Sequence, residues 1–216
     1  MSTRATILLS IFLIVIASVI SAAVYPRLPE RVASHWNTAN QVDGYMPRFW
    51  GAFLMPLVSL GLLALFLLIP QIDPLKANVE KFRGAFNGFI ASIVVFMLYL
   101  HGLTLAWNLG YEQFDMGAAL LPALGLIFIL AGIMMRQAKR NYFIGIRTPW
   151  TLHSDRVWDE THRLGGTLFI ASGLLALAGA FIPRYAFWLL LLVPLLGSTL
   201  FLVVYSYVLY RQETKA

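Results

Sequence analysis

The sequence contains no cysteine, and this absence excludes several kinds of chemistry at once. The chain cannot form a disulfide, a thiolate metal site or a cysteine nucleophile. Disulfides are the usual sign of an oxidising compartment, so the sequence carries no signal for or against one.

Charged residues are also scarce. Asp, Glu, Lys and Arg make up 12% of the 216 residues, and hydrophobic residues make up 59%. An average soluble domain has about 25% charged and about 45–50% apolar residues, so this composition is that of a membrane protein. The net charge of +6 is then better explained by membrane topology than by binding to nucleic acid.

The short motifs of common catalytic and nucleotide-binding sites are missing as well. The sequence has no HExxH zinc motif, no GxSxG nucleophile elbow and no GxxxxGK[ST] phosphate-binding loop. We therefore expect neither an enzyme nor a bound cofactor or metal.

Six long apolar segments, none of which contains Asp, Glu, Lys or Arg, make up most of the chain. They span about 6–25, 50–70, 86–108, 116–135, 165–183 and 186–210. About 20 residues of helix cross the roughly 30 Å of hydrocarbon in a bilayer, so each segment is long enough to span it. Strands of a β-barrel would instead alternate apolar and polar residues. The sequence predicts an all-α integral membrane protein, with residues 1–216 forming a single six-helix domain.

The first of these segments has a second interpretation. Arg4, the apolar run and the small residues 21–23 are also typical of a secretory signal peptide. The run from Ala5 to Val24 is longer than the roughly 7–15 residues of a signal core, so we expect this helix to be retained.

Positive charge is distributed unevenly between the two sides of the predicted bundle. Most of the 16 Lys and Arg residues lie in the N-terminus, the segment 71–85, the loop 136–164 and the C-terminal tail. Loops rich in Lys and Arg stay in the cytoplasm, so both termini are predicted to be cytoplasmic. The loop 26–49 then faces outward and the loop 136–164 faces inward.

The outward loop contains helix and turn signals together with several aromatic residues. Pro29 suits the first turn of a short helix running through His35, and Asp43 with Gly44 indicates a tight turn. The aromatic side chains suit the headgroup level of a bilayer; they are Trp36, Tyr45, Phe49 and Trp50. The loop is therefore expected to lie against the outer membrane face, and a ligand-binding lid is the alternative.

The inward loop predicts a short interfacial helix. Ser154 is a suitable N-cap, and Gly165 with Gly166 allows a bend into the fifth membrane helix. The 3.6-residue period places Asp155, Trp158, Asp159 and His162 on one face of this helix. Spacings of four residues predict the ion pairs Asp159 with Arg163 and Arg156 with Glu160. This face is expected either to bind a partner or to fasten two membrane helices together.

Arg147 lies among aromatic residues just before this helix. Its neighbours are Tyr142, Phe143 and Trp150. A guanidinium group in this position can pair with a carboxylate, cap backbone carbonyls or bind a lipid phosphate. Thr148 precedes Pro149, which favours an extended backbone at that threonine.

These two loops carry a resemblance to a known family. The run GIRTPWTL, the tryptophan of SDRVW and the ending THRLGG are similar to the signature of the SdpI family, named for the membrane immunity protein against the sporulation-delaying toxin. The run LPERVASHWN and the following VDGY resemble the domain of unknown function at the N-terminus of those proteins. Ala33 and Asn40 replace a proline and a glycine that are common in the family, and Asn tolerates the left-handed backbone. The resemblance covers 25–50 and 140–166 directly.

The resemblance implies a membrane protein that protects against a secreted killing peptide and holds a transcriptional repressor at the membrane. It assigns partner or ligand binding outside to His35, Trp36, Asn37, Asp43 and Gly44. Inside, it assigns a partner-binding or structural role to Gly145, Arg147, Thr148, Pro149, Trp150, Trp158, Thr161 and His162, and the helix-face argument adds Asp155 and Asp159.

Two other classes of function remain as alternatives. A transporter is suggested by His101 within an apolar segment and by loop spacings that repeat between the two halves of the chain. A membrane metalloenzyme is suggested by a group of four ligand-type side chains, namely His153, Asp155, Asp159 and His162. A transporter predicts flux of a substrate across the membrane, and a metalloenzyme predicts metal bound to the protein in a stoichiometric amount.

Overall fold

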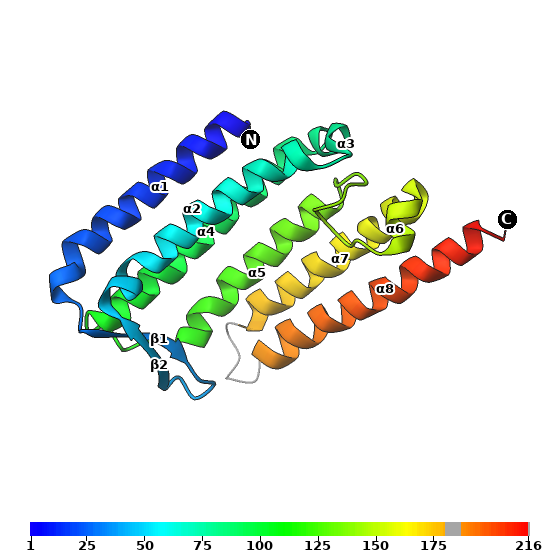
Figure 1. Ribbon diagram of the computed structural model, residues 1–216. Helices are drawn as coiled ribbons and strands as arrows, with labels where there is room; N and C mark the ends of the chain where they lie inside the picture. Colours follow the sequence, from blue (N-terminus) through cyan, green and yellow to red (C-terminus); the bar gives the residue numbers. More distant parts are fainter. Residues whose placement is uncertain (180–186, 216) are drawn as a thin grey trace.

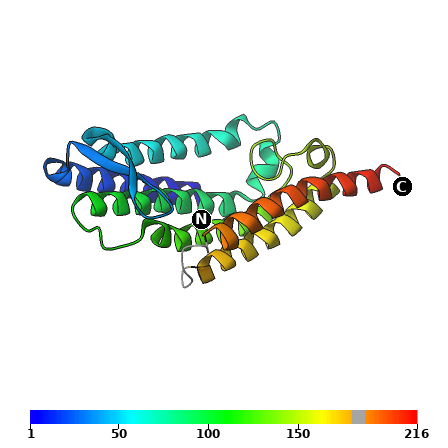
Figure 2. The same ribbon diagram turned by 90° about the horizontal axis from the view of Figure 1, so that it is seen from below.

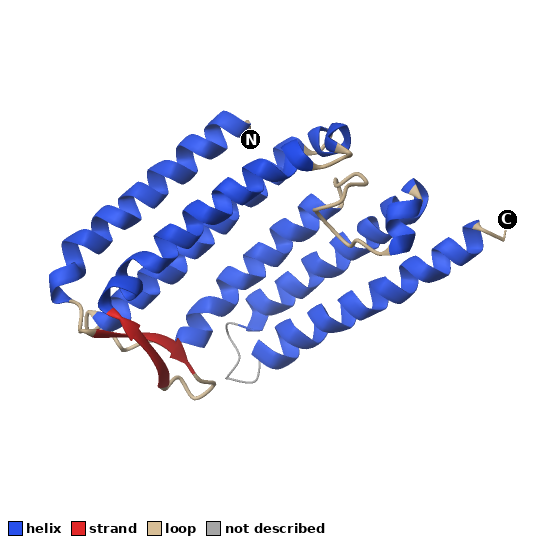
Figure 3. Cartoon of the chain, viewed as in Figure 1, coloured by secondary structure: helices blue, strands red, loops and turns tan. Residues whose placement is uncertain are grey.

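The computed structural model describes residues 1–179 and 187–215. In chain order the elements are α1 (Thr3–Val24), a 3₁₀ turn (Tyr25–Arg27), β1 (Arg31–Trp36), β2 (Val42–Pro47), α2 (Arg48–Ile72), α3 (Lys76–Glu80), α4 (Arg83–Asn108), α5 (Met116–Met135), α6 (Pro149–His153), α7 (Asp155–Gly179), a π-helical turn (Phe187–Leu192) and α8 (Val193–Glu213). Figure 3 shows that helices dominate and that the strands form one small hairpin.

Within the described residues, five helical segments are long and apolar enough to cross a membrane. They are Thr3–Arg27, Arg48–Ile72, Arg83–Asn108, Met116–Met135 and Leu189–Glu213. This result confirms a mostly helical membrane protein. The fifth predicted segment, 165–183, coincides with the second half of α7 and continues into residues outside the described part of the chain. Arg184 and the first residue of the sixth segment also lie outside it.

The long helices lie side by side with the hairpin at one end (Figure 1). Helices α1, α2 and α4 pack together, α4 contacts α5, and α5 is followed by α7 and then α8. Both termini, α3 and α6 lie at the end opposite the hairpin. Figure 2 shows the same separation of the hairpin from the α6 region after a quarter turn. The two loops singled out in the sequence therefore lie at opposite ends of one bundle.

Small side chains bring α5 and α7 into close contact. A Cβ atom added to Gly125 would lie 2.8 Å from the backbone oxygen of Gly173, and one added to Gly132 would lie 2.5 Å from that of Gly166. The two glycine pairs are seven residues apart along each helix and lie on the facing sides of two antiparallel helices. Close backbone approach through small residues is a general mode of helix packing in membranes.

Three local predictions were wrong. Asp43 and Gly44 lie within strand β2 and not in a tight turn, which instead falls at residues 38–40. The segment after Pro29 forms strand β1, paired antiparallel with β2, in place of a helix through His35. The short helix and the bend at Gly165 and Gly166 are replaced by one continuous helix from Asp155 to Gly179. The two glycines instead face α5, the α8 residue Leu202 and the segment that precedes α6. The short helix of this loop is α6, and Ser154 caps α7 by accepting a hydrogen bond from the Val157 amide at 3.2 Å.

Candidate functional site

The segment between α5 and α6 is held by a buried asparagine. The side-chain oxygen of Asn141 accepts hydrogen bonds from the amides of Phe143 at 2.9 Å and Ile144 at 2.6 Å. Its amide group donates to the carbonyls of Lys139 at 2.8 Å and Ile144 at 3.0 Å. This use of both ends of one buried side chain fixes the loop around residues 139–144.

Three signature residues, Gly145, Trp158 and His162, pack against one another at the start of α7. The rings of Trp158 and His162 stack with centroids 3.9 Å apart and planes 14° apart, and both side chains are buried. Gly145 has a φ of +107°, and a Cβ atom there would collide with the His162 ring. A side chain at position 145 is therefore excluded both by backbone conformation and by space.

The hydrogen bonds of His162 specify its protonation state. The backbone amide of Ile146 donates to Nε2 at 2.9 Å, and Nδ1 donates to the Trp158 carbonyl at 2.8 Å. Because an amide can only donate and a carbonyl can only accept, the ring must be neutral with its proton on Nδ1. Burial lowers the pKa of His162 to about 4, against smaller raising effects of the Trp158 carbonyl and the charge of Asp159.

The sequence RTPW starts helix α6 and connects it to α8. The Thr148 hydroxyl accepts from the Thr151 amide at 3.1 Å, and the Thr151 hydroxyl accepts from the Thr148 amide at 2.9 Å, which forms a capping box. Pro149 occupies the first turn, where its missing N–H costs nothing. The Thr148 hydroxyl also lies 3.2 Å from that of Ser206 in α8.

Aromatic contacts strengthen the link between α6 and α8. The Trp150 ring lies 5.1 Å from that of Tyr207, and the His153 ring lies 5.5 Å from that of Tyr210 in an edge-on arrangement. Thr161 is buried on α7, facing away from solvent. These contacts therefore join α6 to α8, while Trp158 and His162 join the start of α7 to the loop before α6.

The charged residues around this motif pair differently from the prediction. Asp155 lies 2.7 Å from Arg140, and Asp159 lies 3.0 Å from Lys139. Arg163 pairs with Glu160 at 2.8 Å, one helical turn away. The predicted pairs Asp159 with Arg163 and Arg156 with Glu160 were wrong, because Asp159 pairs with Lys139 of the preceding loop and Glu160 pairs with Arg163.

Arg147 caps a backbone carbonyl, which is one of the three roles that the sequence allows for its guanidinium group. Its guanidinium donates to the Tyr142 carbonyl at 2.9 Å and so caps the backbone of its own loop. The side chain remains exposed. The predicted common face of α7 is divided, because Trp158 and His162 are buried whereas Asp155 and Asp159 are exposed.

The four ligand-type side chains do not form a metal site. His162 has both ring nitrogens in hydrogen bonds to the backbone, so it has no lone pair for a metal. Asp155 and Asp159 pair with different cations. In the described part of the chain no group of three or more His, Cys, Asp or Glu is placed to hold a metal ion.

At the other end of the bundle, the β-hairpin presents a polar pair. His35 Nδ1 and Asp43 Oδ1 lie 2.5 Å apart, with side chains 70% and 45% exposed. Gly44 is opposite His35, and a Cβ atom there would lie 2.8 Å from the His35 Cβ. The Asn37 side chain accepts hydrogen bonds from the amides of Ala39 and Gln41 and shapes the turn between the strands.

Trp36 has a different position from the polar pair. Its ring packs edge-on against Trp107 of α4 at 5.4 Å, on the inner side of the hairpin. Of the five predicted outer residues, His35 and Asp43 therefore face solvent, whereas Trp36, Asn37 and Gly44 hold the hairpin in shape.

Two asparagines attach the hairpin to the bundle. Asn108, at the end of α4, accepts from the Ala33 amide at 2.7 Å and donates to the Ala33 carbonyl at 3.0 Å. Asn40 donates to the Phe114 carbonyl at 3.2 Å and accepts from the Met116 amide at 2.9 Å. Its φ of 59° confirms that it adopts the left-handed conformation expected at that position.

His101 lies inside the bundle, buried between α1 and α4. Its Nε2 lies 2.7 Å from the hydroxyl of Ser21. A hydrogen bond between neighbouring helices is a common role for a membrane histidine. This contact gives His101 a structural explanation that does not require transport.

Sequence reasoning missed several residues that hold these sites together. Asp73, in the segment 71–85 that the sequence singled out only for its positive charge, is buried and accepts from the Leu75 and Tyr142 amides at 2.7 and 2.9 Å. Ser206 gave no signal because serine is common in membrane helices. A charged residue directly after an apolar segment and before Pro74 was the one available sign for Asp73.

Comparisons with known proteins match the two regions that contain these residues. Residues 137–206, which include α6, α7 and part of α8, match the SdpI/YfhL protein family. Residues 12–60, which include the hairpin, match a domain of unknown function, DUF1648. The chain is 26% identical over 207 residues to the immunity protein SdpI of Bacillus subtilis (strain 168), covering 95% of this chain and 96% of that protein.

Solved structures add no further relative, since none matches the chain. The two family segments occur in the order that the resemblance predicted, and the curated relative extends over nearly the whole length. Residues 137–206 of the chain therefore match the SdpI/YfhL protein family, and nearly the whole chain is similar to an immunity protein.

Proposed function

We propose that the protein is a non-catalytic membrane immunity protein that protects its cell from a secreted, membrane-active peptide. Its similarity to an immunity protein over 95% of the chain supports this function. The observation that carries the proposal is that the hairpin of one family segment and the α6 region of the other lie at opposite ends of one helical bundle. An outer surface can meet a peptide, while an inner surface can meet a cytoplasmic protein.

In this proposal the chain crosses the membrane six times with both termini in the cytoplasm. Helix α7 is then the fifth of the six spans, entering the bilayer after its charged first turns. The excess of Lys and Arg at the end with both termini supports this orientation.

The hairpin is the proposed contact for the peptide. His35 and Asp43 are exposed there, together with Tyr45 and Arg31. The Arg31 guanidinium lies 5.7 Å from the Tyr45 ring centroid. Such a surface combines a charged pair with an exposed ring, and both can bind a peptide that approaches from the membrane surface.

At the inner end, residues 140–166, here called the signature segment, are the proposed contact for a cytoplasmic repressor. Its exposed side chains include Arg147, Asp155 and Asp159, and the buried pair Trp158 and His162 holds the segment in place. A rigid surface carrying both signs of charge suits a protein partner.

Survival of sensitive cells tests the proposal. Cells killed by the sporulation-delaying toxin or by related membrane-active peptides are expected to survive at least tenfold better when they express the protein. The double variant His35→Ala with Asp43→Asn should lose this protection at unchanged protein level. Thr38→Ala, at the exposed turn of the same hairpin, is the matched control and should protect normally.

Survival that is unchanged by the folded wild-type protein across the peptide panel contradicts the immunity function. Flux of a solute into vesicles that contain the protein and no peptide would favour the transporter in its place. Loss of that flux in a folded His101→Ala variant would then assign His101 to transport.

A further inference from the structure

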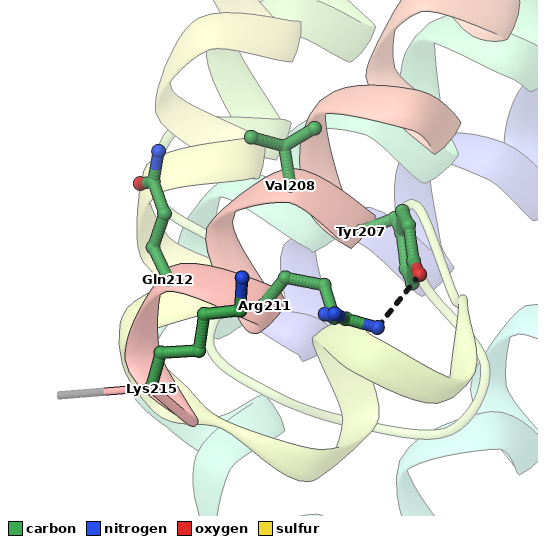
Figure 4. A pocket seen from close by; sticks show the side chains of 5 residues that line it. All are labelled: Tyr207, Val208, Arg211, Gln212 and Lys215. Carbon is green, nitrogen blue, oxygen red and sulfur yellow. Dashed lines mark hydrogen bonds between the residues drawn. The ribbon is translucent and has the colours of Figure 1, made fainter.

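A shallow pocket lies at the C-terminal end of α8. It is lined by Tyr207, Val208, Arg211, Gln212 and Lys215, and Figure 4 shows it from close by. Arg211 donates to the Tyr207 hydroxyl at 3.3 Å, and its guanidinium lies 5.9 Å from the ring centroid. Over residues 1–179 and 187–215, neither Arg211 nor Lys215 forms an ion pair with a carboxylate.

An apolar strip leads to this pocket along the same face of α8. Leu200, Val204 and Val208 are 70%, 60% and 44% exposed. With 3.6 residues per turn, Arg211 continues the face on which these three residues lie, and Lys215, two residues after the end of α8, lines the same pocket. The face has an apolar part within the membrane segment and a basic part at its end.

The length of the strip matches one leaflet of a bilayer. At a rise of 1.5 Å per residue, Leu200 lies about 16 Å along the axis from Arg211. One leaflet has about 15 Å of hydrocarbon. A lipid whose phosphate lies at Arg211 would therefore extend its acyl chain to about Leu200.

We propose that this face binds one anionic phospholipid, with the phosphate held by Arg211 and Lys215 and one acyl chain packed along Leu200, Val204 and Val208. Charge complementarity supports an anionic headgroup, because two cations four residues apart have no carboxylate partner among residues 1–179 and 187–215. The apolar strip supports a lipid over a free phosphate, which would contact the cations alone. Tyr207 packs on Trp150, so the bound headgroup would lie beside the family signature segment.

Lipid titration of the full-length protein in detergent tests this assignment. The probes are phosphatidylglycerol and phosphatidylcholine, and native mass spectrometry measures how much of each stays bound. We expect stronger binding of phosphatidylglycerol and a loss of about tenfold in Arg211→Gln with Lys215→Gln. The control is Lys76→Gln with Arg156→Gln, which removes two exposed positive charges at the same end and should bind as the wild type does.

Two further variants separate binding from folding. Lys215→Gln alone leaves the contact between Arg211 and Tyr207 in place and should weaken binding by about threefold. Arg211→Lys with Lys215→Arg keeps both charges and should restore it. Equal binding of the two lipids, or an equal loss in both double glutamine variants, would overturn the proposal. Displacement of phosphatidylglycerol by an equal concentration of inorganic phosphate would overturn it too, since it would reveal a site for free anions.

Discussion

His162 connects three parts of the signature segment through single contacts. It stacks on Trp158, accepts from the Ile146 amide and lies directly against Gly145. Each contact depends on a neutral, immobile ring. A small change of side chain at position 145, or a change in the charge of the His162 ring, should therefore lower the free energy of unfolding substantially.

Gly145→Ala is the smallest change that tests this packing. The methyl group would collide with the His162 ring, and alanine at a φ of +107° is strained by roughly 1–2 kcal/mol before any collision. We expect a loss of at least about 2 kcal/mol in the free energy of unfolding, measured by denaturation of the purified protein in detergent.

Gly61→Ala is the matched control for this variant. Gly61 lies within α2, and a Cβ atom there would meet nothing within 4 Å. Alanine is favoured over glycine in a helix by up to about 1 kcal/mol, so Gly61→Ala should be neutral or slightly stabilising. Similar losses in both variants would show that the contact with His162 has no special role.

Protonation of His162 should make stability depend on pH. Its pKa is about 4 in the folded protein and 6.5 in the unfolded chain. Above pH 6.5 both states hold the ring neutral. As the pH is lowered from 6.5 to 4, the unfolded state binds the proton before the folded state does. The free energy of unfolding therefore decreases by up to about 3 kcal/mol over this range. Below pH 4 this contribution changes no further.

Melting temperatures of the wild type and of His162→Gln between pH 7.5 and 4.5 measure this effect. The drop should be steeper in the wild type, because the variant lacks the titrating ring. His153→Gln removes an exposed histidine of the same segment and should keep the steep drop. Parallel curves for wild type and His162→Gln would show that His162 does not control the pH response.

At the scale of elements, helices α5 and α7 depend on their facing glycines. Gly132→Val would place two methyl groups against the Gly166 backbone and the Ile170 side chain. Such overpacking typically costs about 1–3 kcal/mol, and backbone on the facing side has little freedom to move. Thermal unfolding in detergent should show this loss.

Gly102→Val is the control within the membrane region. Gly102 is an exposed residue of α4, and a Cβ atom there meets nothing within 4 Å. This variant should retain nearly all of the wild-type stability. An equal loss in both variants would mean that helix propensity, and not contact between α5 and α7, determines the effect.

These same contacts explain which elements the sequence could and could not predict. Unbroken apolar runs are a sufficient local signal for the membrane helices. Whether Gly165 and Gly166 bend a helix or admit a neighbour depends on α5, which is distant in the sequence. The hairpin likewise depends on Asn108, whose side chain pairs with Ala33 across 75 residues. Pro29 gave only a local helix signal, so the prediction for that loop was wrong.

The candidate site was predictable in its residue types but not in its geometry. The family resemblance identified Trp158 and His162, yet no local pattern shows that they are buried while Asp155 and Asp159 are exposed. The partner of each aspartate lies in the preceding loop, about 15 to 20 residues away. Long-range packing decides such pairings, and periodicity within one helix does not contain that information.

At the scale of the whole molecule, the proposed division of labour requires that the hairpin and the signature segment lie on opposite sides of the membrane. Because the chain has no cysteine, single cysteines can be introduced without background. Thr38, Arg156 and Thr214 are exposed positions in the hairpin turn, at the start of α7 and just after α8. A membrane-impermeant maleimide added to intact cells should label Thr38→Cys at once, and the other two variants only after the membrane is permeabilised.

The pattern of labelling also determines the number of crossings. If Arg156→Cys reacts from outside together with Thr38→Cys, the two family segments share one compartment and the two-sided mechanism is wrong. If Thr214→Cys reacts from outside together with Thr38→Cys while Arg156→Cys stays protected, only one of α7 and α8 crosses the membrane. Protection of both inner positions is the result expected if α7 crosses outward and α8 returns, because the two helices run in opposite directions.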